Sequence, residues 1–149
     1  MTIFADTEFK VSEKGYGTAR QLCSKICTQT GRKRAFKALI CMDALADYLY
    51  SQGLRLDISK NLYKIYQINE EFEITDIHCN GWYIDVLPVV NGKFVLIPKI
   101  HFSNNILPDL YVVADYNQTA RKIKFPGCIE PDKIDKSVQD EHYFIVDIS

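Results

Sequence analysis

The sequence predicts an α+β fold in which an N-terminal helical hairpin packs on a small antiparallel, barrel-like β-sheet of about six strands. Apolar residues recur at helical spacing over residues 16–53. Short strand-like runs with turn residues between them fill residues 72–148, and two Asn-Gly pairs separate three of these runs. Since 149 residues is the size of one ordinary domain, we expect a single domain, 1–149, built from consecutive hairpins after the helices.

Two helices are expected in the first third of the chain. The first covers residues 16–29, and Gly31 is expected to end it. The second covers residues 32–52 and carries a broad apolar stripe made of Phe36, Leu39, Ile40, Leu45 and Leu49. Gly53 then stands where a glycine with left-handed backbone commonly ends a helix. Residues 54–71 fit either a helix or a short strand.

The β part opens with the strongest turn signals of the sequence. Asn80-Gly81 and Asn91-Gly92 each lie between strand-like runs, and both residues of such a turn adopt positive φ. Two turns in succession predict a three-stranded antiparallel meander. Pro88 has no N–H to donate, which indicates a sheet edge or a bulge at that position.

Three further strands complete the predicted sheet. A loop, a fourth strand, a turn and a fifth strand are expected in order at residues 101–108, 109–114, 116–118 and 119–125. Pro126 and Gly127 are expected to break the fifth strand. A charged connection and a last strand follow at residues 130–141 and 142–148.

One run of the β part is apolar at every position. Residues 94–97 read Phe-Val-Leu-Ile, and Trp82 with Tyr83 makes the same pattern one strand earlier. Because successive side chains of a strand point to opposite faces, both faces must be covered there. One face would be the sheet's own core. The other would pack on the N-terminal helices, which we favour, or on a partner chain, so a homodimer stays open.

Composition excludes several classes of protein. The 18 basic and 19 acidic residues give a formal charge of −1, which argues against a protein that coats nucleic acid. Five irregularly spaced cysteines without a signal peptide are typical of free thiols in a cytoplasmic protein. The apolar runs are too short to span a bilayer, so no membrane association is expected.

Motifs for catalysis are missing from the sequence. It contains no glycine-rich phosphate loop, no Gly-x-Ser-x-Gly and no set of residues with metal-ligand spacing. We therefore expect a non-enzymatic interaction or regulatory module with an unidentified protein partner and no cofactor or metal. Trp82 and Tyr83 are candidate contacts, because aromatic residues are enriched at interface hot spots.

A nucleic-acid or anion-binding module is the first alternative. It would use a basic cluster at the start of the second helix, Arg32, Lys33, Arg34 and Lys37, helped by Arg121, Lys122 and Lys124 if these fold close by.

A thiol enzyme is the second alternative. His101 could activate Cys79, whereas His78 cannot readily do so because neighbours on a strand face opposite sides.

Residues 36–131 resemble an uncharacterised, mainly cyanobacterial family, domain of unknown function number eighteen twenty-two. The matching features are Ala46 through Gly53, Pro88-Val89, Ile97-Pro98, Tyr111 through Val113, and Ala120 through Pro126. The family usually carries a Cys-Arg pair before the Pro-Val, where this chain has Val86 and Leu87. The resemblance implies the fold given above and a module that occurs inside longer proteins. It implies no activity.

Overall fold

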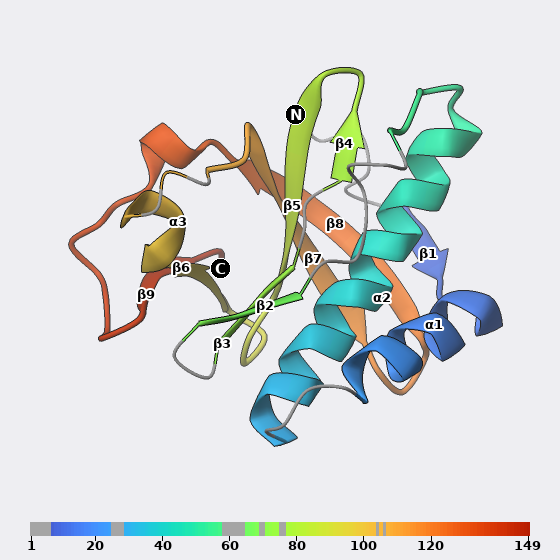
Figure 1. Cartoon of the computed structure of the whole chain (residues 1–149), viewed down its shortest axis with the longest axis horizontal. Helices are drawn as coiled ribbons and strands as arrows, with labels where there is room; N and C mark the ends of the chain where they lie inside the picture. The colour runs from blue at the N-terminus through green and yellow to red at the C-terminus, as the bar shows by residue number, and fades with distance from the viewer. Residues whose placement is uncertain are drawn as a thin grey trace.

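The computed structural model describes residues 7–24, 29–57, 65–68, 71–74, 77–103, 105 and 107–149. Its helices are α1 (Glu13–Cys23), α2 (Gln29–Ser51) and α3 (Lys99–Ser103), with a 3-10 turn at Pro131–Lys133 (Figure 1). Its strands are β1 (Glu8–Lys10), β2 (Ile65–Ile68), β3 (Glu71–Ile74), β4 (Ile77–Cys79), β5 (Trp82–Pro88), β6 (Phe94–Pro98), β7 (Leu110–Asn117), β8 (Lys122–Ile129) and β9 (Tyr143–Asp147). The α+β class is confirmed.

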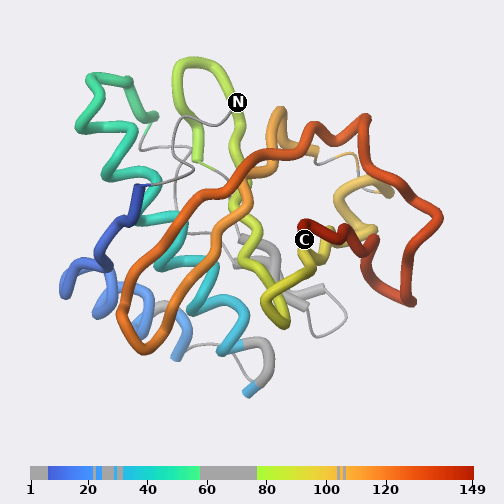
Figure 2. The backbone as a smooth tube through the Cα atoms, turned by 180° about the vertical axis from the view of Figure 1, so that it is seen from behind, coloured from blue at the N-terminus to red at the C-terminus, as the bar shows by residue number. Residues whose placement is uncertain are grey.

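A curled sheet of five strands separates two apolar cores. Its order is β1-β8-β7-β5-β4, and α1 and α2 cover one face while β6, β9 and α3 lie on the other side (Figure 1). Helix residues such as Leu39 and Leu45 share the first core with Val86 and Val112 of the sheet. Leu87, Tyr111 and the β6–β9 pair form the second core. β7 and β8 are the two longest strands of this sheet and lie next to each other, and the turn that connects them lies beside α1 (Figure 2).

Of the two hairpins in the predicted meander, the first is present and the second does not continue the sheet. Asn80 and Gly81 have φ of 49° and 83°, and β4 pairs with β5 as an antiparallel hairpin. Asn91 and Gly92 also turn with positive φ, but β6 then pairs with β9 in a separate two-stranded sheet. The second neighbour of β5 in the sheet, besides β4, is β7, and β5 and β7 run parallel. An Asn-Gly pair sets a local reversal of the chain, whereas the choice of neighbouring strand depends on the whole topology.

Pro88 is the last residue of β5, which lies between β7 and β4 and is therefore not the edge strand that was one of the two expectations. Val89 donates its N–H to the carbonyl of Ala114 on β7 at 2.9 Å. Because N–H directions alternate along a strand, the nitrogen of Pro88 faces the opposite side. The partner there, β4, ends its register at Ile84, so Pro88 leaves no ladder bond unmade.

Pro126 and Gly127 do not break a strand, contrary to expectation. The register of β8 on β7 shifts between Val113 and Asp115, so that Phe125 and Pro126 together lie opposite Ala114. This bulge accommodates the missing N–H of proline, and β8 continues to Ile129.

Two helix expectations also need correction, and one is confirmed. Gly31 lies inside α2 and does not end α1, because an interior glycine costs only about 1 kcal/mol and packing outweighs it. The first three residues of the predicted loop at 101–108 belong to α3, which begins at Lys99.

The predicted end of the second helix at Gly53 is confirmed. Gly53 has φ of 79°, and the N–H groups of Gly53 and Leu54 donate to the carbonyls of Tyr50 and Leu49, which is a Schellman C-cap. In the region left open, 65–68 is strand β2, while Leu62 lies outside the described residues.

The apolar strand residues are covered less evenly than predicted. Val95 and Ile97 are fully buried in the second core, but Phe94 and Leu96 on the opposite face are half-buried. Trp82 and Tyr83 are 55% and 41% exposed, so the expectation of cover on both faces is wrong there. They sit at the tip of the β4–β5 hairpin, where their backbones pair with β4 but their side chains stay largely open to solvent.

Helix α1 approaches α2 closely at Gly15. The N–H of Gly15 donates to Ser12 Oγ at 2.9 Å, which caps the helix. A Cβ on Gly15 would lie 2.2 Å from Asp43 Oδ2 of α2, whereas a Cβ on Gly17 would meet nothing within 4 Å. The close contact between α1 and α2 therefore requires glycine at position 15 but not at position 17, although both glycines lie in α1.

Replacing Gly15 by Ala is expected to cost stability although alanine favours helix. Gly17→Ala should leave the protein equally stable or raise its free energy of unfolding by up to about 1 kcal/mol. Gly15→Ala forces the Asp43 carboxylate to move, and we expect it to be at least about 1 kcal/mol less stable than Gly17→Ala. Urea unfolding of both variants measures the difference, and equal midpoints would contradict the close approach.

Candidate functional site

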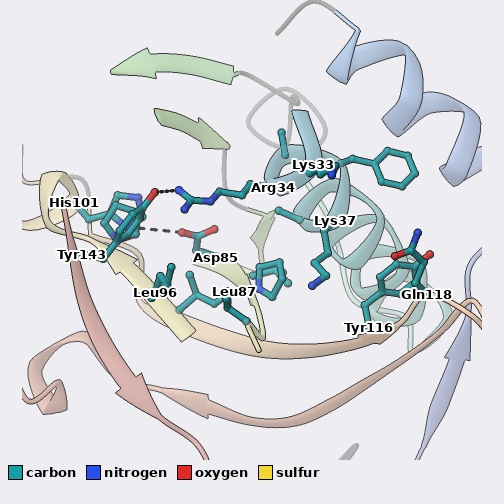
Figure 3. Close-up of a pocket in the computed structure, with 17 residues that line it drawn as sticks. Lys33, Arg34, Lys37, Asp85, Leu87, Leu96, His101, Tyr116, Gln118 and Tyr143 are labelled. Atoms are coloured by element: carbon teal, nitrogen blue, oxygen red, sulfur yellow. Dashed lines mark hydrogen bonds and ion pairs between the residues drawn. The ribbon is translucent and has the colours of Figure 1, made fainter. Parts of the chain in front are cut away.

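A pocket of about 530 Å³ lies beside the first turns of α2 (Figure 3). Its walls come from α2, the second half of β5, β6, α3, the end of β7 with the residue after it, and the start of β9. The volume is within the usual range for a small-molecule site. The pocket thus lies between α2, the curled sheet and the β6–β9 pair.

The α2 wall is basic. Lys33, Arg34 and Lys37 line the pocket, and Lys37 lies four and three residues after the other two, so it neighbours both of them on the helix surface. Lys37 extends into the space between Asp85 and Tyr116, and its Nζ lies 3.3 Å from the carbonyl oxygen of Val89 (Figure 3). Three of the four residues in the predicted basic cluster therefore meet at one cavity. Arg32 is not among the residues that line it.

Arg34 joins α2 to the last strand. Its guanidinium donates a hydrogen bond to the Tyr143 hydroxyl and lies 5.2 Å from the centroid of that ring. Tyr143 pairs with Pro98 at the end of the β6–β9 ladder, so the bond spans one end of the pocket.

Opposite the basic wall lies a buried polar pair. Asp85 and His101 are 8% and 4% exposed, and they are the buried carboxylate and imidazole groups in the part of the chain that the structure describes. His101 Nδ1 lies 3.9 Å from Asp85 Oδ2 and 2.7 Å from the Tyr111 hydroxyl. The parallel register pairs Asp85 with Tyr111, and α3 brings His101 over them. Burying such groups costs free energy unless partners compensate, so their position at a cavity favours a functional role.

Sequence reasoning missed Asp85. The available signal was a lone carboxylate at an inward position of the apolar strand Trp82 to Leu87. His101 was singled out, but as a partner for a cysteine.

The floor of the pocket is apolar. Leu87, Pro88 and Val90 contribute from β5 and the residues after it, and Leu96 and Pro98 from β6. At the end away from His101, Tyr116 and Gln118 close the cavity (Figure 3). The Tyr116 hydroxyl is buried without a hydrogen-bond partner among the described residues, and burial raises its pKa.

The other predicted contacts lie elsewhere. Trp82 and Tyr83 are exposed at the hairpin tip and do not line the pocket. Arg121 pairs with Glu13 at 3.3 Å, and Lys122 and Lys124 both pair with Glu8. The structure therefore does not join these three cations or the two aromatic residues to the basic wall. The protein-interaction hypothesis stays a prediction.

None of the described cysteines lines the pocket. Cys23, Cys41 and Cys79 lie in the first core, and Cys27 lies outside the described residues. Burial raises the pKa of Cys23 to about 11 and that of Cys41 to about 12, and it also raises the pKa of Cys79. His101 faces Tyr111 and Asp85, and Cys79 does not line the pocket. This geometry gives the thiol-enzyme hypothesis no support, and it stays a prediction.

No family model, curated protein or solved structure matches this chain. The resemblance to the cyanobacterial family accordingly stays a prediction. Among the described residues, no group of three or more His, Cys, Asp or Glu could hold a metal ion. The helices that the structure describes are also all too short or too polar to cross a membrane.

Thiol reactivity should follow exposure. Cys128 is exposed, so iodoacetamide at neutral pH is expected to label it well before the buried Cys23, Cys41 and Cys79, whose raised pKa values disfavour the thiolate. Mass spectrometry of the digested peptides resolves the sites, and Cys128→Ser is the control that removes the rapid product. Labelling of Cys79 ahead of Cys128 would instead revive the thiol enzyme.

Proposed function

We propose that this protein is a binding module that takes a small organic anion in the pocket beside α2. The observation that carries the proposal is the wall of three cations, Lys33, Arg34 and Lys37, above an apolar floor. It narrows the anion-binding alternative that the sequence offered and retains the expectation of a non-enzyme.

Charge is the first support. Asp85 is the only carboxylate among the lining residues that the structure describes, against three basic side chains. Charges at a recess bounded by protein interact more strongly than charges in bulk water, because the local dielectric constant is lower. An anion in the pocket would therefore gain more from these cations than it could at an open surface.

The apolar floor is the second support. A bare inorganic ion would leave the half-buried Val90 and Leu96 facing water, whereas an organic body would cover them at roughly 25 cal/mol per Å² of apolar surface. Mostly apolar walls with a few convergent polar groups are typical of small-molecule sites.

The same geometry favours a small anion over nucleic acid. Nucleic-acid binding uses an extended basic surface that contacts many phosphates. Here the three cations line one recess, and the further basic residues Arg121, Lys122 and Lys124 are paired with glutamates outside it.

The proposal is tested with three ligands that share one ring and differ in charge. In an NMR titration, benzoate is expected to shift the amide signals of α2 residues 33–37 and of Tyr143, whereas benzamide and benzylamine should not. Arg34→Met should weaken benzoate binding about tenfold, the cost of one lost charge-assisted hydrogen bond.

The matched control is Lys14→Met, which removes a cation from the exposed surface of α1 outside the pocket and should change nothing. Equal shifts from all three ligands, or shifts only at other residues, would refute an anion site at this wall.

A further inference from the structure

The two lysines of the basic wall are one helical turn apart. Lys33 and Lys37 both line the pocket, so their ammonium groups can approach the same point above the floor. An ammonium group is a compact charge with three donors and no acceptor. Two of them beside a guanidinium suit a group that offers several anionic oxygens around one centre, such as phosphate.

The net charge of the lining decides between kinds of anion. Lys33, Arg34 and Lys37 stand against the single carboxylate of Asp85, which leaves an excess of two positive charges (3 − 1) from these side chains of the described lining. A carboxylate or sulfate ester carries −1 and would leave one positive charge uncompensated beside apolar walls. A phosphate monoester carries about −1.5 to −2 at pH 7, which matches the pocket.

Asp85 also sets an upper limit on that charge. Its carboxylate is buried in the wall opposite the lysines, so it repels any further anionic group that reaches across the floor. A built-in repulsion of this kind excludes competitors as effectively as attraction selects a ligand. Diphosphates and polycarboxylates are the competitors that it would reject.

We propose that the ligand is a phosphate monoester of a compact, mainly apolar alcohol, with its phosphate held by Lys33, Arg34 and Lys37 and its body on Val90 and Leu96. This inference rests on the proposed function and names the ligand class of the same site. Asp85 then acts as the residue that excludes more highly charged anions.

Isothermal titration with phenyl phosphate, phenyl sulfate and inorganic phosphate at pH 7.5 tests the inference. The first two ligands share a ring and a tetrahedral head and differ in charge. We expect phenyl phosphate to bind about tenfold or more tightly than phenyl sulfate, because it neutralises one more positive charge. Inorganic phosphate should also bind more weakly than phenyl phosphate, because it does not cover the floor.

Variants locate the effect. Lys33→Met and Lys37→Met should each weaken phenyl phosphate binding about tenfold and narrow its advantage over phenyl sulfate, while Lys14→Met should do neither. Asp85→Asn removes the negative charge of the lining, so this variant should admit pyrophosphate, which the unaltered protein should reject. Thermal unfolding confirms that each variant is folded. Lys33 is exposed, so Lys33→Met carries the test if Lys37→Met fails to fold.

The outcomes separate the two proposals. Equal affinity for phenyl phosphate and phenyl sulfate, both lost in Lys33→Met, would overturn the phosphate inference and leave small-anion binding intact. Phenyl phosphate binding that neither lysine variant changes would overturn the assignment to this wall. If neither phenyl ligand nor benzoate binds, the proposed function and the inference fail together.

Discussion

The parallel pairing of β5 with β7 is the constraint on which the rest of the structure depends. Parallel neighbours cannot be joined by a tight turn, so the chain between Pro88 and Leu110 must travel away from the sheet and return. That excursion supplies β6 and α3. It covers the second face of the sheet, forms the apolar floor and carries His101 back over Tyr111. With α2 packed on the first face and overhanging the end of β5, a cavity remains between helix and excursion.

Asp85 shows how the same strand serves packing and chemistry. Its neighbours Val86 and Leu87 belong to opposite cores, because β5 is buried on both faces. A carboxylate in such a strand loses its hydration, and only nearby polar groups can offset that loss. His101 lies 3.9 Å from the carboxylate of Asp85, and the cations of α2 line the same pocket. The charges that the pocket presents to a ligand therefore also offset part of the free-energy cost of burying Asp85 in β5.

Local signals in the sequence predicted local structure well. The Asn80-Gly81 hairpin and the Gly53 helix end follow from backbone conformations that only a few residues adopt, and both are present. Pairing between distant segments was not predictable. The pairing of β6 with β9 and that of β5 with β7 depend on which apolar faces pack together in the folded chain. The basic cluster was visible at 32–37. The pocket was not, since Asp85 and Tyr143 reach it only through those distant pairings.

The hydrogen bond from Arg34 to Tyr143 has a consequence for the end of the chain. Tyr143 begins β9, and its hydroxyl is one of the groups that hold this strand against α2. An anion that draws the guanidinium toward itself competes with that hydroxyl. Occupancy of the pocket and docking of the C-terminal strand are then thermodynamically linked, and linkage is reciprocal. Whatever loosens β9 from α2 removes the Tyr143 hydroxyl as a competitor for Arg34, so a molecule that binds residues 143–147 would change the affinity of the pocket for the anion without contacting it.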